Sequence, residues 1–129
     1  MVRRLPTILN TLIDNIITCK DEELKSELDS CFDSVLLSLD EFDGLNTAMS
    51  VILALVKHDD HRKRASIDLH LVKFFQGADI DISRYYPDMI RTLLIAFDDS
   101  DKEVVKAAWA ALSALTQRCL LYTSDAADE

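Results

Sequence analysis

Glycine and proline are scarce in this sequence of 129 residues, which contains two of each. Sheet sandwiches and glycine-rich catalytic loops need many turns, several of them with the positive φ that glycine adopts most readily. Two glycines also cannot make a phosphate-binding loop or a dinucleotide-binding fingerprint. The scarcity therefore disfavours these classes and favours long helices joined by short polar connections.

Cysteines and long apolar runs are also limited. The three cysteines, at positions 19, 31 and 119, form no CxxC pair. An odd number at such spacing is not a disulfide framework, so we expect a reducing, cytoplasmic location. No uninterrupted apolar run reaches the roughly 18 residues of a membrane span. The apolar stretch that follows Arg3 and Arg4 is interrupted by polar residues within two turns and does not read as a secretory signal.

Positive charge is in short supply, because 14 basic residues face 23 acidic ones and the formal net charge is −9. Such a balance repels phosphate backbones and anionic membranes, so neither DNA nor a membrane is an expected partner. Hydrophobic residues nevertheless make up 49% of the chain, which is enough for a packed core.

Six segments carry apolar residues at the spacing of an amphipathic helix. They cover about residues 5–18, 21–39, 43–57, 59–77, 83–97 and 101 onward.

Their ends carry helix-start and helix-stop residues. Asp21 and Asp43 are candidate N-caps, because a carboxylate accepts hydrogen bonds from free amide groups. Gly77 is expected to end the fourth helix in the left-handed conformation. In the fifth helix the spacing i, i+3, i+4 and i+7 predicts that the residues facing the core are Ile90, Leu93, Leu94 and Phe97.

An internal repeat is the strongest signal. Residues 5–13, LPTILNTLI, match residues 86–94, YPDMIRTLL, at an offset of 81 residues. Acidic breaks at Asp21, Asp59 and Asp101 are separated by 38 and 42 residues. This period is that of helix pairs in HEAT or armadillo arrays. We therefore predict an all-α fold, an α-solenoid of about three HEAT-type helix pairs.

The array is expected to cover residues 1–118, with approximate repeats at 5–39, 43–76 and 83–118. The last residues, 119–129, read CLLYTSDAADE. This string resembles the translation of a transposase adapter used in sequencing libraries. We predict that it is a non-native tail and exclude it from fold reasoning.

The third repeat resembles the HEAT pattern closely. Turn aspartates accept hydrogen bonds from helix N–H groups, and small residues let paired helices approach. Lys106 stands where the pattern usually has arginine, so a ladder between turn aspartates should be weaker there; in the middle repeat the arginine is present. The predicted repeat-structural residues are Asp59, Asp60, Asp98, Asp99, Asp101, Val105, Lys106, Ala108, Trp109 and Leu112.

Positive charge is concentrated in Arg62, Lys63 and Arg64, which are candidate partner-binding residues. The alternative, which we favour, is that one arginine joins the HEAT turn while the others are solvated. The adjacent sequence His58-Asp59-Asp60-His61 is a weak metal candidate, because zinc sites use ligands in a defined tetrahedral geometry and these residues straddle a helix break. We predict no metal site, no cofactor and no catalytic residues.

Residues 51–118 are similar to the fungal members of a family of giant HEAT-repeat proteins, the translational activators of the general amino-acid control pathway. The similarity lies in LALVKHDDHRKRAS and in DLHLVKFFQGADIDISRYYPDMIRTLLIAFDDSDKEVVKAAWAALSALTQ. It implies a C-terminal fragment of a cytoplasmic, ribosome-associated scaffold. That family activates the kinase that phosphorylates the alpha subunit of translation initiation factor 2 during amino-acid starvation. The implied partners are the RWD domain of the kinase and the ribosome.

Two other functions remain open from the residues alone. One is a HEAT scaffold of another system, such as a transport receptor or a phosphatase subunit. The other is direct binding of RNA or the ribosome through the basic cluster. An enzyme is the least expected class.

Overall fold

The computed structural model describes residues 2–127, and the side chains of residues 3–121. Within this range the chain is helical and has no strand, which confirms the all-α fold. The elements are η1 (Val2–Arg4), α1 (Leu5–Thr18), α2 (Glu22–Leu37), α3 (Asp43–Leu55), α4 (His61–Gly77), η2 (Ser83–Tyr85), α5 (Tyr86–Ala96) and α6 (Lys102–Ala127).

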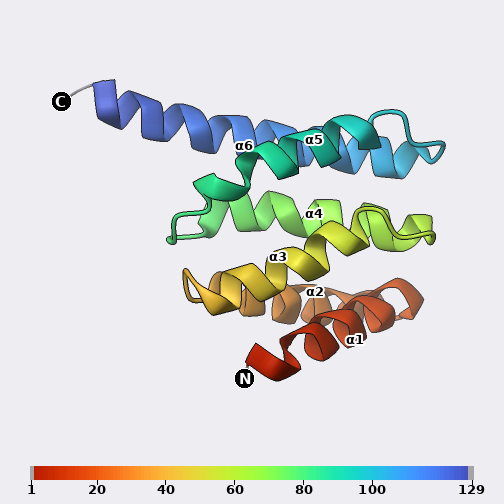
Figure 1. The fold of residues 1–129 in the computed structure, drawn as a ribbon. Coiled ribbons are helices and arrows are strands. Elements are labelled where there is room, and N and C mark those ends of the chain that lie inside the picture. Colours follow the sequence, from red (N-terminus) through yellow and green to blue (C-terminus); the bar gives the residue numbers. More distant parts are fainter. Residues whose placement is uncertain (1, 128–129) are drawn as a thin grey trace.

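The helices form two layers (Figure 1). Helices α1, α3 and α5 make one layer, and α2, α4 and α6 make the other, so that the two termini lie at opposite ends of the stack. The prediction of a solenoid built from three helix pairs is confirmed. Helix α4 is central, because it contacts α1, α2 and α3 on one side and packs most extensively against α6 on the other.

The sequence repeat corresponds to a repeated backbone path. Helices α1 and α5 each follow a short 3-10 turn, and each has proline in its first turn, where the missing N–H costs nothing. The residues before the two helices have nearly the same conformation, with φ −96° and ψ −7° at Arg4 and φ −97° and ψ −5° at Tyr85.

The second helix of every pair begins at a capping aspartate. The carboxylates of Asp21 and Asp101 each accept hydrogen bonds from the backbone N–H groups two and three residues later. Asp60 accepts one from the N–H two residues later. These bonds satisfy amide groups that have no partner within the helix, so they set where α2, α4 and α6 start.

Two local expectations were wrong. Asp43 makes no cap hydrogen bond; the carboxylate of Asp40 accepts instead from the backbone N–H groups of Phe42 and Gly44. Gly77 does end α4, but its φ is not positive. A Cβ at Gly77 would lie only 3.2 Å from Cδ2 of Leu37, so this glycine provides room for α2 rather than an unusual backbone conformation.

The buried side of α5 was predicted correctly at Leu93 and incorrectly at Ile90 and Leu94, while Phe97 is half-buried. Met89 and Leu93 are buried, whereas Ile90 and Leu94 are exposed to 38% and 51%. Large apolar residues lie on both sides of this helix. Within the described part of the chain, other helices cover only the side that carries Met89.

The core is continuous through the three pairs. Large side chains from α1 to α4 fill its first two thirds, while α6 contributes mainly alanine. Ala108 and Ala111 are completely buried, and their small size lets α6 lie close to its neighbours.

No helix in residues 2–127 is both long and apolar enough to cross a membrane. Helix α6 continues past Arg118 into the predicted adapter-derived tail, so its backbone marks no boundary there. Residues 128–129 of that tail lie outside the described residues, and the boundary of the array at residue 118 stays a prediction.

Candidate functional site

The basic cluster at the start of α4 is divided among three partners. The ammonium group of Lys63 lies 2.6 Å from Oδ1 of Asp14 in α1. Arg62 pairs with the capping Asp60 at 3.0 Å, and its side chain is 54% exposed. Arg64 turns the opposite way from Lys63, toward the third helix pair. The three side chains therefore do not form one basic patch.

Arg64 joins the turn before α4 to the turn before α6. Its Nε and Nη2 donate to the two carboxylate oxygens of Asp99, at 2.8 and 3.1 Å. Its Nη1 also donates to the backbone oxygens of His58 and Asp59. The guanidinium holds the pKa of Asp99 below its usual value. One arginine of the cluster, Arg64, thus forms part of the HEAT turn.

The neighbouring turn residues reinforce this connection. Nδ1 of His61 lies 2.7 Å from the second oxygen of Asp101, the cap of α6. The Asp99 carboxylate also accepts a hydrogen bond from the backbone N–H of Asp101. Asp59 and Asp98 are exposed. Among the described residues, no group of three or more His, Cys, Asp or Glu side chains is placed to hold a metal ion.

The predicted structural residues of α6 occupy different environments. Ala108 is buried and Val105 and Leu112 are half-buried, but Trp109 is 57% exposed. The Trp109 ring stacks on Phe97 with a centroid distance of 4.6 Å. Lys106, in the arginine position, extends into solvent and lies 3.8 Å from Glu103 rather than near a turn aspartate.

Three buried polar positions were missed by sequence reasoning: His70, Asp68 and Arg118. His70 is 4% exposed, with Nδ1 2.8 Å from Oδ1 of Asp33 and its ring 4.2 Å from the Phe32 ring. The sequence did contain a signal for this buried position, namely a histidine three residues after Ile67 within an apolar stripe. His70 ties α4 to α2, just as Lys63 ties it to α1.

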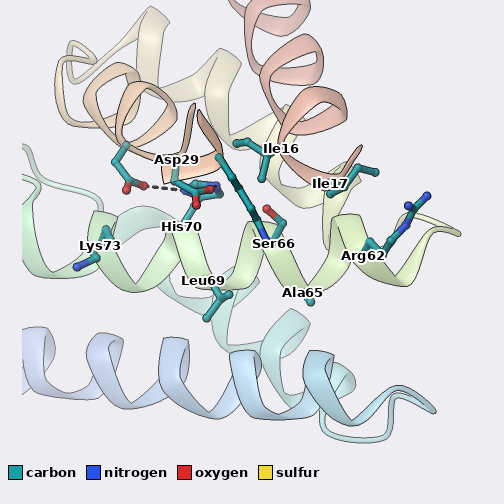
Figure 2. Close-up of a pocket in the computed structure, with 11 residues that line it drawn as sticks. Ile16, Ile17, Asp29, Arg62, Ala65, Ser66, Leu69, His70 and Lys73 are labelled. Atoms are coloured by element: carbon teal, nitrogen blue, oxygen red, sulfur yellow. Dashed lines mark hydrogen bonds and ion pairs between the residues drawn. The ribbon is translucent and has the colours of Figure 1, made fainter. Parts of the chain in front are cut away.

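A groove of about 400 Å³ opens between the end of α1, α2 and α4 (Figure 2). Figure 2 shows Leu69 on α4 between Arg62 toward one end of the helix and Lys73 toward the other. The lining residues are Ile16, Ile17, Lys25, Asp29, Asp33, Arg62, Ala65, Ser66, Leu69, His70 and Lys73. Such a mixed surface suits the binding of a protein segment.

Comparison with known families identifies the array. A family model described as "Stalled ribosome sensor GCN1-like, HEAT repeats" matches residues 1–120. The chain belongs to this GCN1-like HEAT-repeat family. The family assignment confirms the resemblance inferred from the sequence and the HEAT character of the helix pairs.

Two curated proteins show the same relationship. The chain is 34% identical over 119 residues to "eIF-2-alpha kinase activator GCN1" of Saccharomyces cerevisiae, which covers 92% of this chain. It is 26% identical over 110 residues to "Protein ILITYHIA" of Arabidopsis thaliana, which covers 83%. The chain spans 4% of the length of each relative. No solved structure matches this GCN1-like chain.

Proposed function

We propose that this chain is a non-catalytic scaffold segment of a cytoplasmic, ribosome-associated activator of the kinase that phosphorylates initiation factor 2 alpha. The similarity to the yeast kinase activator over 92% of the chain carries the proposal. The fold supports it, because helix pairs in a solenoid present a long surface on which other proteins can bind.

The proposed partners are the RWD domain of the kinase and the ribosome. Within the basic cluster, Arg62 is the most exposed residue and is proposed to contact a partner. The side chains of Lys63 and Arg64 are only 18% exposed and are paired with Asp14 and Asp99. Each can therefore contact a partner protein only while it also contacts its aspartate. Binding of RNA through this cluster is less favoured, since two of its three cations, Lys63 and Arg64, are largely shielded and held by aspartates.

The test is a segment exchange. Residues 1–118 of this chain replace the matched segment of the yeast activator, and phosphorylated initiation factor 2 alpha is measured in starved cells. We expect phosphorylation close to that of the unmodified activator. A helical-repeat spacer of equal length is the control and should not restore it. An exchanged protein of normal abundance that leaves the factor unphosphorylated would overturn the proposal.

A further inference from the structure

The groove between α2 and α4 has cations at its rim and an apolar middle. On α4, Arg62, Ala65, Leu69 and Lys73 are separated by three, four and four residues, so they form one stripe along the helix. Leu69 is 55% exposed at the centre of this stripe. Eleven residues of α-helix place Arg62 and Lys73 about 16 Å apart.

Helix α2 forms the polar wall of the groove, and part of its charged surface is accessible to a ligand. Lys25, Asp29 and Asp33 recur every four residues and share one side of the helix. The ammonium groups of Lys25 and Lys73 form no hydrogen bond or ion pair with other described residues. The His70 ring lies between the two carboxylates, with Nδ1 2.8 Å from Oδ1 of Asp33 and Nε2 3.4 Å from Oδ1 of Asp29, whose side chain remains 41% exposed. Two lysines are thus free at the rim of a groove in an otherwise acidic chain.

We propose that this groove binds an acidic peptide segment of a partner protein. An aliphatic side chain of that segment packs on Leu69, and its carboxylates face Lys25, Arg62 and Lys73. In an extended segment, which rises about 3.3 Å per residue, the roughly 16 Å between the backbone positions of Arg62 and Lys73 corresponds to about five residues. The inference rests on the proposed scaffold function, and it specifies the chemistry of one partner segment.

A peptide fits this groove better than a nucleic acid. An RNA strand carries a negative charge at every nucleotide, and the carboxylates of Asp29 and Asp33 between the cations would repel it. A peptide places charge only where the cations are. Its backbone N–H groups can also donate hydrogen bonds to the exposed Asp29.

The experiment measures fluorescence anisotropy of a labelled synthetic peptide that has paired glutamates at both ends and a leucine in the middle. The full chain is compared with a variant that carries Lys25→Glu and Lys73→Glu. The matched control carries Lys57→Glu and Lys102→Glu, two exposed lysines outside the groove. Circular dichroism verifies that the helix content of all three proteins is equal.

We expect the groove variant to bind at least about tenfold more weakly, and the control to stay within about twofold, because contacting charge pairs dominate over long-range attraction. Leu69→Ser should also weaken binding, as should serine in place of the peptide leucine. Equal losses in both double variants would overturn the proposal, because they would indicate attraction by net charge alone.

Labelled oligouridylate serves as the RNA probe. Tighter binding of this probe than of the peptide, lost in the groove variant, would overturn the proposal in favour of RNA. The two proposals can fail separately. If the segment exchange restores kinase activation but the peptide does not bind, only the groove assignment fails. If the peptide binds but the exchange has no effect, the translational role fails.

Discussion

Asp68 is the most unusual residue of the structure. It is 1% exposed in the middle of α4, and its Oδ1 has no hydrogen-bond partner among the residues that the structure describes. Burial raises the pKa of Asp68 to about 7; the charge of Asp99 adds to the rise, and the guanidinium of Arg64 opposes it. A carboxyl in this position is neutral when the chain is folded under mildly acidic conditions.

This pKa predicts stability that falls as pH rises. Between about pH 4 and pH 7 the folded Asp68 holds a proton that the unfolded one has lost, so the free energy of unfolding decreases with pH. The total decrease is at most about 4 kcal/mol. Urea unfolding at pH 5, 6, 7 and 8 should show the decline, and Asp68→Asn should flatten it. An identical pH dependence in the variant would contradict the assignment.

The bond between Arg64 and Asp99 is expected to contribute measurably to stability. Both side chains are largely shielded from solvent, with 18% and 11% exposure, and their contact is bidentate. A double-mutant cycle with Arg64→Met and Asp99→Asn should give a coupling energy of about 1–2 kcal/mol in urea unfolding. The same cycle on Lys106 and Glu103, an exposed pair at 3.8 Å, is the control and should give close to zero.

At the scale of elements, helix α4 connects the solenoid through contacts of basic and histidine side chains with carboxylates on two sides. Lys63 and His70 reach α1 and α2, whereas Arg64 and His61 reach the turn before α6. The end of α4 is held by a further residue, Arg118 of α6. The second helix of the middle pair is therefore the element through which the outer pairs are coupled.

Arg118 fastens α6 to the end of α4. Its guanidinium donates to the backbone oxygens of Phe75 and Ala78 at 3.1 and 2.8 Å, and to that of Ile80 at 2.9 Å. Carbonyl groups at a helix end need such donors when they are buried. Arg118→Ala should lower the free energy of unfolding by about 2–3 kcal/mol.

Hydrogen exchange should locate this loss. We expect faster amide exchange in residues 75–82 of the Arg118→Ala variant, with little change in α1. Arg91→Ala is the comparison, because Arg91 is 72% exposed and 3.8 Å from its carboxylate partner. A loss of stability as large for Arg91 as for Arg118 would show that the carbonyl contacts are unimportant.

At the scale of the whole molecule, one side of the third pair remains apolar and exposed. Ile90 and Leu94 lie one turn apart on α5, and beyond them Phe97 stacks on the exposed Trp109 of α6. Apolar surfaces of this kind mark protein contacts or lead to association.

We therefore expect concentration-dependent self-association of the chain in sedimentation velocity. Leu94→Lys should reduce it, because a charge is placed in the apolar surface. Ile95→Lys makes the same change at a 64% exposed residue on another side of α5 and should have a smaller effect. A chain that is monomeric at all concentrations would contradict this expectation.

Much of the fold was predictable, because its signals are local. Helical spacing, the proline at the start of the first helix and the aspartate before the second depend on residues within one or two turns of one another. The misplaced cap at Asp43 and the expected burial of Leu94 show the limit of local signals. The amides that Asp43 would cap, those of Leu45 and Asn46, bond instead to the backbone oxygens of Asp40 and Phe42. An apolar residue on a two-sided helix is buried only if another helix covers it.

The candidate site was less predictable for the same reason. The basic cluster was identified as a unit, yet its members separate toward Asp14, Asp60 and Asp99. Arg118 gave no signal at all, since its acceptors are backbone oxygens about 40 residues earlier in the chain. Every residue has the same backbone oxygen, so no pattern of side chains in the sequence predicts which of these oxygens Arg118 contacts.

The sequence by itself determined that six amphipathic helices form, that they pair at a constant period and that aspartates open the second helix of each pair. Only the tertiary structure decided which carboxylate each cation meets, which side of α5 is covered, and that Asp68 is buried with no hydrogen-bond partner for its Oδ1 among the described residues. The first group depends on neighbours along the chain. The second depends on which helices meet in space, and the small side chains of α6 decide how closely that helix approaches its neighbours.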